Sequence, residues 1–466
     1  MTAAANGTDQ PLRVAVVGSG PAGFYAAGAL FGGDVPVEVD MIERLPTPWG
    51  LVRLGVAPDH PKIKSVSRAF ERIADQPGFR FFGNVEVGRD IGHGDLLELY
   101  DAVIYAVGAQ SDRHMGIPGE DLPGSWSATE FVAWYNGHPD HQQLEFDLSG
   151  ERAVVIGNGN VAVDVARMLA LTPEELAPTD TTDRAIEAIG GSGIREIVLV
   201  GRRGPVQAAF TNPELLELGE LAGADVIVDP ADLELDPASE AALEGDTNAK
   251  RNLDVLRGYA VRVPEGKPKR LVLRFLRSPV ALQGEDRVEA VELVRNRLDP
   301  DGRGGLRAVA TDEHETLPAG IVFRSVGYRG VALPDVPFDE ERGTIRNERG
   351  RVLDENGVQV PGVYATGWIK RGPSGVIGTN KKDATETVEL LLEDLGVAPS
   401  KNVSADTAEQ FIAGRVARLV MYDHWTSIDR HERTTGERLG RPRVKLCTWD
   451  ELLDTAEKVA GENTQA

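Results

Sequence analysis

The 466-residue chain contains a single cysteine, Cys447. An intramolecular disulfide and a Cys-x-x-Cys redox pair each need two thiols, so both are excluded, and with them the chemistry of a disulfide reductase. Long hydrophobic runs are also missing, and no stretch approaches the length of a membrane span. Residues 1–10 carry neither a basic nor an apolar leader segment, which predicts a disordered tail. We therefore expect a cytoplasmic protein in a reducing compartment.

Positive charge is scarce, because 50 lysines and arginines stand against 73 acidic residues, for a net charge of −23. Nucleic-acid binding needs a basic face, so a nucleic-acid partner is not expected. One segment reverses the sign, since residues 249–277 hold nine lysines or arginines and only two acidic residues. We interpret this segment as a docking surface for an acidic partner, and an ordinary solvated face is the alternative.

The first motif that is present joins a buried type of strand to a helix of small residues. Residues 14–17 predict the strand, residues 24–30 predict the helix, and the turn between them has the pattern G-x-G-x-x-G. Gly18 permits the tight turn, Gly20 lets the backbone approach a pyrophosphate, and Gly23 lets the helix pack closely on the strand. This arrangement predicts a dinucleotide site at the start of the helix.

A second dinucleotide site is predicted further along the chain. The first unit continues with a strand over residues 35–42 that ends at Glu43, a residue placed to accept hydrogen bonds from a ribose. The pattern returns as G-x-G-x-x-A at residues 157–162, but there the next strand ends in Arg202 and Arg203. Arginines accommodate a 2′-phosphate, so the second site is predicted to prefer NADP(H) over NAD(H).

The remaining pattern predicts further α/β elements around these two sites. The proline-rich residues 45–61 predict an ordered loop that lines a site, and residues 172–193 are interpreted as an insertion. A row of glutamates at 214, 217 and 220 on one side of a helix is usually solvated. Other expected segments are helices at 63–75, 163–171, 210–221 and 384–395, strands at 79–87, 100–109, 196–200, 271–275 and 321–328, an appended helical segment to about 453, and a disordered tail after 461. The strand at 321–328 is expected to return the chain to the first domain.

Four long motifs in this order resemble the adrenodoxin-reductase family, and within it the bacterial NADPH:ferredoxin reductases. They are residues 47–53 with 57–62, residues 157–167, residues 201–205 and residues 367–373. The resemblance spans about residues 12–453 and implies an α/β fold with two Rossmann-like dinucleotide-binding domains, as in glutathione reductase. The NADP domain is expected at 111–327, inserted in an FAD domain made of residues 1–110 and of residues 328–466, which include a C-terminal extension.

The resemblance also implies a set of binding residues. Contacts to FAD are expected from Gly18, Gly20, Ala22, Gly23, Glu43, Leu51, Val87, Trp368, Gly375, Val376 and Ile377. Contacts to NADP are expected from Arg113, Asn158, Gly159, Asn160, Val161, Arg202, Arg203, Glu214 and Gly375. At Trp368 the chain departs from many two-dinucleotide flavoproteins, which carry an aspartate there. His60 and Glu217 are expected near the nicotinamide as an acid–base couple, although a lone histidine is more often structural.

The implied activity is transfer of a hydride from NADPH to FAD and then of single electrons to a ferredoxin, an acidic iron–sulfur protein. The ferredoxin is expected to dock around Lys250, Arg251 and Arg257, and no metal is required for the hydride transfer. One alternative is an NADPH dehydrogenase that reduces quinones or small acceptors. Another is an electron-relaying subunit like the small subunit of glutamate synthase, for which several cluster-binding cysteines would be expected.

Overall fold

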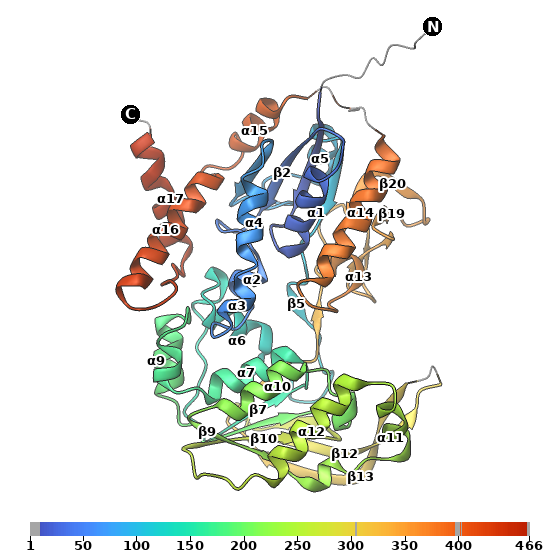
Figure 1. Ribbon diagram of the computed structural model, residues 1–466, viewed down its shortest axis with the longest axis vertical. Coiled ribbons are helices and arrows are strands. Elements are labelled where there is room, and N and C mark those ends of the chain that lie inside the picture. The colour runs from blue at the N-terminus through green and yellow to red at the C-terminus, as the bar shows by residue number, and fades with distance from the viewer. Residues whose placement is uncertain (1–9, 303–304, 397–400, 402, 464–466) are drawn as a thin grey trace.

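The computed structural model describes residues 10–302, 305–396, 401 and 403–463, which form two bodies stacked end to end (Figure 1). The first and last parts of the chain build the upper body, and the middle part builds the lower one. In the part of the chain that is described, no helix is both long enough and apolar enough to cross a bilayer.

The upper body is built on a seven-stranded sheet with β1 near its centre and the order β18-β19-β20-β4-β1-β2-β3. The strands from β20 to β3 run parallel, and all six residues of β1 are buried, as expected for a strand covered on both faces. The bounds are β1 (Leu12–Val17), β2 (Val37–Glu43), β3 (Phe79–Gly83), β4 (Ala102–Tyr105), β18 (Asn347–Glu348), β19 (Arg351–Leu353) and β20 (Gln359–Ala365).

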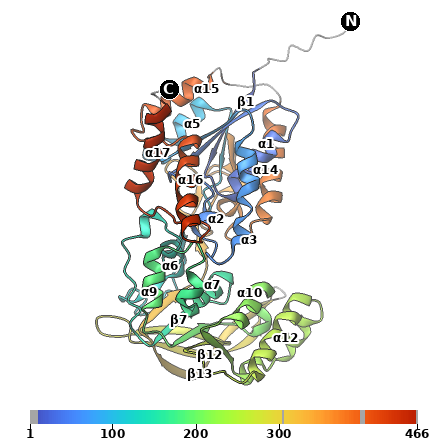
Figure 2. The same cartoon turned by 60° about the vertical axis from the view of Figure 1, so that its left-hand side comes forward.

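Helices cover this sheet, and α1 and α14 lie side by side on one face (Figures 1 and 2). Helix α1 begins at Pro21, three residues earlier than predicted, because proline needs no amide donor in the first turn of a helix. The helices of this body are α1 (Pro21–Phe31), α2 (Leu51–Leu54), α3 (Pro61–Lys64), α4 (Ser67–Ala74), α5 (His93–Leu99), α13 (Trp368–Arg371) and α14 (Thr379–Leu395). The single helix predicted at 63–75 is therefore two helices, and the strand predicted at 79–87 ends at Gly83.

The lower body contains a six-stranded parallel sheet in the order β6-β14-β7-β8-β10-β9, and a three-stranded antiparallel sheet, β11-β12-β13. The strands are β6 (Ser125–Ser127), β7 (Arg152–Ile156), β8 (Glu196–Val200), β9 (Ala224–Val228), β10 (Lys269–Arg274), β11 (Arg277–Gln283), β12 (Ala290–Pro300), β13 (Leu306–Pro318) and β14 (Ile321–Arg324). The helices are α6 (Ala128–Tyr135), α7 (Asn160–Ala170), α8 (Pro173–Leu176), α9 (Asp183–Gly190), α10 (Asn212–Glu217), α11 (Pro237–Leu243) and α12 (Thr247–Val261).

The segment interpreted as an insertion, residues 172–193, forms α8 and α9. Its threonines begin these helices, since the side chain of Thr172 accepts from the Glu175 amide and that of Thr182 accepts from the Ala185 amide. Helix capping accounts for these threonines, and the interpretation of the segment as an insertion stays a prediction.

The chain passes between the bodies at a short two-stranded ladder. Strand β5 (Ser111–Asp112) pairs antiparallel with β15 (Tyr328–Arg329), and the amide of Arg113 donates to the carbonyl of Gly327 at 2.9 Å. The prediction that the strand at 321–328 returns the chain to the first domain is wrong for most of that segment, because β14 pairs with β6 and β7 of the lower body. The return begins at β15, and the small hairpin β16 (Phe338–Asp339) and β17 (Thr344–Ile345) follows it.

The C-terminal segment consists of the helices α15 (Ala405–Ala413), α16 (Tyr422–Arg438) and α17 (Trp449–Asn463), which flank the upper body (Figure 1). A backbone bridge between Val420 and Gly83 attaches this segment to the first sheet. Helix α17 continues beyond residue 461, where a disordered tail was predicted. Residues 464–466 of that tail, and residues 1–9 of the predicted N-terminal tail, lie outside the described residues.

A buried ionic cluster connects the C-terminal segment to both bodies. Asp180, from the lower body, binds the Lys64 ammonium of α3 at 2.7 Å and the Lys445 ammonium at 3.1 Å. Both ammonium groups also donate to the side-chain oxygen of Asn136. Because Lys445 is fully buried and two cations share one carboxylate, burial and the neighbouring Lys64 lower the pKa of Lys445 to about 7 against the opposing effect of Asp180.

A second buried cluster surrounds Glu432 of α16. Its carboxylate accepts from the Arg53 guanidinium of α2 at 2.5 and 2.8 Å, from Arg443 at 3.0 Å and from the Leu446 amide at 2.9 Å. Glu432 is fully buried, and the two guanidinium groups hold its pKa below the ordinary value in spite of that burial. The segment 441–447 thus takes part in both clusters, through Lys445 in the first and through Arg443 and Leu446 in the second.

Candidate active site

The first glycine turn has the geometry that a dinucleotide site requires. Gly18 has φ = +101°, and a Cβ atom there would lie 2.6 Å from the carbonyl oxygen of Ala106. A Cβ at Gly23 would overlap the carbonyl oxygen of Gly18, so both positions need glycine. No atom lies within 4 Å of a Cβ built on Gly20, which leaves open space at the start of α1. The turn can therefore admit a pyrophosphate at the amino end of the helix.

The loop over residues 44–60 lies across this turn. The Trp49 amide donates to the Ser19 carbonyl at 2.9 Å, and a Cβ at Gly50, which has φ = +49°, would lie 2.9 Å from Cα of Gly20. The loop therefore brings Leu51, 37% exposed, close to the first turn. The carboxylate of Glu43 accepts from the amide and hydroxyl of Ser19 at 2.9 and 2.7 Å, so Glu43 lies at the turn.

The end of strand β20 meets the same turn from the other side. Gly367 has φ = +75°, and a Cβ there would lie 2.5 Å from Cβ of Ala22. Trp368 follows, and its ring centroid lies 5.2 Å from that of Tyr328 on the connecting ladder. The Gly367 amide donates to the carboxylate of Asp383 at 2.6 Å, and Asp383 was missed because it lies sixteen residues beyond Gly367.

Four of the residues predicted to contact FAD lie on segments for which no direct contact with the first glycine turn is described. Gly375, Val376 and Ile377 belong to the loop that precedes α14, and Gly375 has φ = +78°. Val87 lies beyond the end of β3, in the buried cluster that packs against Val17 and Ile42. Their contacts with FAD, and that of Gly375 with NADP, stay predictions.

The second glycine turn is also open. Gly157 has φ = +135° and lies against the carbonyl of Ser325, whereas a Cβ on Gly159 would meet no atom within 4 Å. The side-chain nitrogen of Asn158 is buried at this turn and donates no hydrogen bond within the described structure. An orphaned buried donor beside an open helix start fits a polar ligand there.

The two arginines after β8 lie beside this turn with their guanidinium groups unpaired. Within the described ranges, neither Arg202 nor Arg203 forms an ion pair. Arg202 is exposed, and its carbonyl accepts from the Asn296 side chain at 2.8 Å, which fixes the backbone of the turn. Partial burial, and to a smaller extent Arg202, lowers the pKa of Arg203. Two adjacent cations without a counter-ion fit an anionic ligand such as a 2′-phosphate.

Asn160 positions the neighbouring helix. Its side-chain oxygen accepts from the Thr211 amide at 2.8 Å, and the carbonyl of Asn158 accepts from the Ala209 amide at 3.0 Å. These bonds join the start of α7 to the start of α10. Val161 packs partly buried against the core of the lower body. The predicted contacts of Asn160 and Val161 with NADP stay predictions, as does that of Arg113, which is exposed on the connecting ladder.

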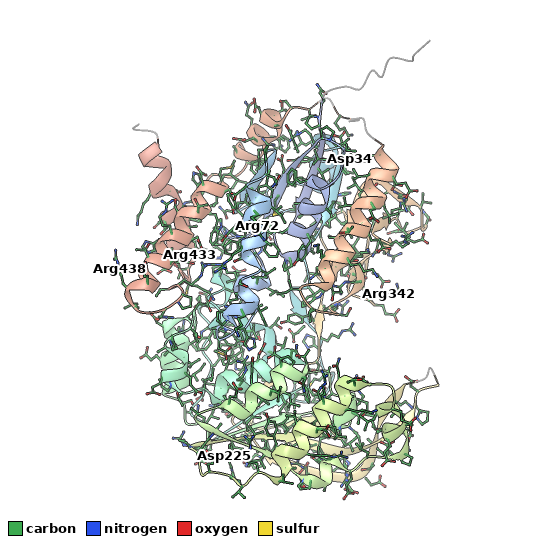
Figure 3. All side chains as sticks on the ribbon, viewed as in Figure 1. Asp34, Arg72, Asp225, Arg342, Arg433 and Arg438 are labelled. Atoms are coloured by element: carbon green, nitrogen blue, oxygen red, sulfur yellow. The ribbon has the colours of Figure 1, made fainter. Side chains whose placement is uncertain are left out.

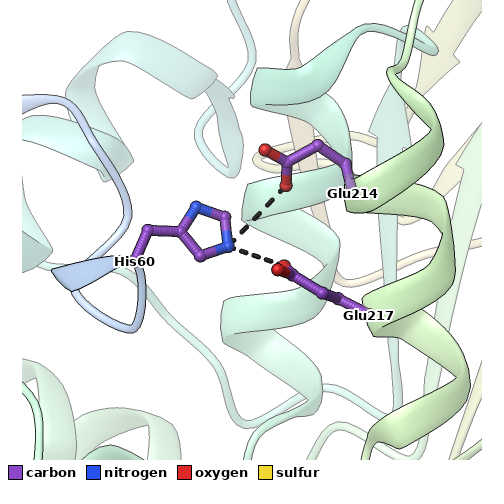
Figure 4. A group of neighbouring side chains, drawn as sticks. All are labelled: His60, Glu214 and Glu217. Atoms are coloured by element: carbon purple, nitrogen blue, oxygen red, sulfur yellow. Dashed lines mark hydrogen bonds and ion pairs between the residues drawn. The ribbon is translucent and has the colours of Figure 1, made fainter. Parts of the chain in front are cut away.

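His60, from the loop of the upper body, meets two glutamates of α10 from the lower body (Figure 4). The Nε2 atom of His60 lies 2.6 Å from Oε2 of Glu217 and 3.8 Å from Oε2 of Glu214. His60 and Glu214 are buried, and Glu217 is half-buried. The expectation that this glutamate row is solvated is therefore wrong for Glu214, while Glu220 is exposed as expected.

Three charged residues behind this cluster were missed by sequence reasoning. The buried guanidinium of Arg167 binds Asp59 and Asp164, and it lies 3.9 Å from Glu217. Burial, and then the charges of Glu214 and Glu217, raise the pKa of Asp164 well above its usual range. The sequence signal that could have indicated Asp164 and Arg167 is that these opposite charges lie three residues apart on the largely apolar helix α7.

The basic segment 249–277 does not form one continuous surface. Arg274 and Arg277 are ion-paired with Glu315, and Lys269 donates to the carbonyl of Leu169 from within the sheet. The interpretation of the whole segment as one docking face is therefore wrong. Three of its cations are exposed together on the same helix, α12: Lys250, Arg251 and Arg257.

Comparison with known proteins gives close full-length relatives. Residues 12–197 match the family model described as pyridine nucleotide-disulphide oxidoreductase. The chain is 55% identical over 456 residues to NADPH-ferredoxin reductase FprA of Mycobacterium tuberculosis, which covers 95% of this chain and 99% of that protein. It is 41% identical to the mitochondrial NADPH:adrenodoxin oxidoreductase of Arabidopsis thaliana, with 96% of each chain covered. The solved structure of Mycobacterium tuberculosis FprA in complex with NADPH superposes with a TM-score of 0.92 at 54% identity, covering 96% of this chain and 100% of that one.

Proposed function

Because the chain belongs to the family of NADPH-ferredoxin reductases to which adrenodoxin oxidoreductase is related, we propose that it is an FAD-containing NADPH:ferredoxin oxidoreductase. The observation that carries the proposal is the pair of glycine turns, each followed by a helix whose start is open, on the parallel strands of two separate sheets. Two dinucleotide sites in one chain are the arrangement that electron transfer between two coenzymes requires.

We assign FAD to the first turn and NADP(H) to the second. The loop 44–60 and the end of β20 enclose the first turn, which favours a coenzyme that stays bound. The second turn carries the unpaired Arg202 and Arg203, which favour a coenzyme with a 2′-phosphate. When bound, FAD accepts the hydride of NADPH and passes its electrons on singly. The predicted domain boundaries at 110/111 and 327/328 belong to this proposal, and their support is that both fall at the ladder of β5 and β15.

His60, Glu214 and Glu217 are proposed to face the nicotinamide. They lie where the two bodies meet. His60 belongs to the loop of the upper body, whereas the two glutamates belong to α10, whose start is bound by Asn160 of α7. The short contact between His60 and Glu217 holds the imidazole in one orientation, and the free Oε2 of Glu214 is available to accept from an amide group. These residues would therefore orient the nicotinamide ring, and the hydride transfer needs no proton from them.

The exposed cations of α12 are the proposed docking site for ferredoxin. Lys250, Arg251 and Arg257 stand out on a protein of net charge −23, so an acidic partner would be guided to them by charge. The proposed location of the protein is the cytoplasm, and its support is the single cysteine, which suits a reducing compartment.

The proposal is tested by cytochrome c reduction with NADPH, with and without ferredoxin, at increasing salt. We expect the rate to depend on ferredoxin and the KM for ferredoxin to rise with salt, because salt screens exposed charges. Arg251→Glu with Arg257→Glu should raise that KM at least about tenfold, since both substitutions reverse a steering charge. The matched control is Arg430→Glu with Arg438→Glu on α16, where Arg438 projects at the edge of the upper body, well away from α12 (Figures 1 and 3).

A rate independent of ferredoxin would contradict the proposal and favour the NADPH dehydrogenase that reduces small acceptors. Equal effects of the two double substitutions would leave ferredoxin as the acceptor and refute α12 as its docking site.

A further inference from the structure

The cluster of His60, Glu214 and Glu217 has the donor set of a transition-metal site. One imidazole nitrogen and two carboxylate oxygens lie within 4.8 Å of one another. Imidazole and carboxylate are ligands that Zn²⁺ takes in sites with an open fourth position. Among divalent ions, a nitrogen donor favours Zn²⁺ over Mg²⁺ and Ca²⁺, which prefer oxygen alone.

A second observation is the state of Glu214. Its side chain is nine-tenths buried, and its Oε2 atom receives no hydrogen bond in the described structure although it points at His60 (Figure 4). A buried carboxylate oxygen without a donor is costly unless something binds it. This oxygen faces the space that the imidazole and the second carboxylate share, so a cation there would satisfy it.

The two distances from His60 require only small movements, and all three ligand atoms lie within 4.8 Å of one another. Tetrahedral zinc with bonds of about 2.0–2.1 Å separates its ligand atoms by roughly 3.3 Å. The contact between His60 and Glu217, at 2.6 Å, would open by about 0.7 Å, and the contact between His60 and Glu214, at 3.8 Å, would close by about 0.5 Å. Glu217 is 39% exposed and free to adjust, and its exposed side leaves a position for water.

The surrounding charge also favours a cation. The guanidinium of Arg167 lies 3.9 Å from Glu217 and also binds Asp59, so this one cation is shared between Asp59 and the two glutamates of the cluster. The carboxylates of Glu214 and Glu217 therefore face the site without a full counter-charge of their own.

We propose that His60, Glu214 and Glu217 form an inhibitory Zn²⁺ site that is occupied only when NADP(H) is absent. Zinc there would join the upper-body loop to α10 across the boundary between the two bodies. The exclusion of NADP(H) rests on the proposed function, which places the nicotinamide at these residues, whereas zinc binding itself does not depend on it.

The test is calorimetric titration of the purified holoprotein with Zn²⁺ alone. We expect one high-affinity site, weakened more than about tenfold in both His60→Gln and Glu214→Gln, because removal even of a residue that only supports a ligand costs 10- to 100-fold. Glu220→Gln is the matched control, since this exposed glutamate lies three residues beyond Glu217, and it should leave the affinity unchanged. The visible flavin spectrum checks that each variant is folded and loaded.

Saturating NADP⁺ should abolish the high-affinity site, and Zn²⁺ should inhibit ferricyanide reduction in competition with NADPH, reversibly on addition of a chelator. Equal zinc affinity in the wild type, His60→Gln and Glu214→Gln, or no high-affinity binding at all, would overturn the metal site. Zinc binding that is lost in the variants but unaffected by NADP⁺ would overturn the exclusion and, with it, the placement of the nicotinamide.

Discussion

Replacing Arg202 and Arg203 together by alanine should remove most of the preference for NADPH over NADH that we propose for this protein. The two guanidinium groups have no ion-pair partner in the described structure, so their removal breaks no internal ion pair, and we expect the fold to be retained. The carbonyl of Arg202, which the Asn296 side chain binds, belongs to the backbone and is retained.

The size of the effect follows from the number of charged contacts. A hydrogen bond to a charged group contributes about 1.5–3 kcal/mol, so two of them contribute at most about 3–6 kcal/mol. At about 1.4 kcal/mol per factor of ten, the preference for NADPH over NADH should fall by roughly two to four orders of magnitude. The upper value is a ceiling, because adjacent contacts to one phosphate are not additive.

The assay is the steady-state kcat/KM for NADPH and for NADH with ferricyanide as the acceptor. The loss should appear in the KM for NADPH, with the value for NADH nearly unchanged. The double substitution Arg430→Ala with Arg438→Ala removes the same charge from α16 and should leave the ratio as it is in the wild type. An equal fall for the two coenzymes would refute the assignment of the 2′-phosphate to this arginine pair.

Three further predictions concern buried charged groups between distant segments of the chain. His60→Ala should slow flavin reduction by NADPH in stopped-flow measurements while FAD stays bound, and loss of FAD would instead show a structural role. Glu432→Ala should lower the free energy of urea unfolding by about 3–5 kcal/mol, because it leaves the buried guanidinium of Arg53 without its ion-pair partner, although Arg443 keeps Asp429. The exposed Glu437→Ala should have little effect. The pKa of Lys445 is about 7 in the folded protein and 10.5 in the unfolded chain. Between these two pH values the unfolded chain binds more protons than the folded protein. The free energy of unfolding should therefore rise with pH in this range, by up to about 1.4 kcal/mol per pH unit. Lys445→Met should flatten that slope in unfolding measured between about pH 7 and pH 9, and an unchanged slope would count against the low pKa.

The parts of the site that sequence reasoning predicted well are the parts determined by neighbouring residues. Gly18 and Gly157 adopt positive φ because their own turns require it, and each turn joins a strand to a helix adjacent in the chain. Arg202 and Arg203 lie just beyond the end of β8, so their position could be predicted from that strand. Such local patterns also predict the order of strands and helices. The helices α1 and α7 begin a few residues earlier than predicted, at Pro21 and Asn160.

The parts that local patterns could not predict depend on contacts between distant segments. His60 and Glu217 were paired from a family resemblance, because no local pattern relates residues 157 positions apart. The same holds for Asp180 and Lys445, which meet only after both bodies and the C-terminal segment have folded. The basic segment was misjudged because charge along the sequence does not show which cations, such as Arg274, pair inside the fold.

The most direct test of the central claim is an anaerobic titration of the purified protein with NADPH, followed through the visible absorption of its flavin and then by addition of oxidised ferredoxin. The account predicts that the protein is yellow as isolated, that stoichiometric NADPH bleaches the flavin band, and that ferredoxin restores it. A colourless protein after reconstitution with FAD, or a flavin band that NADPH does not bleach, would contradict the account.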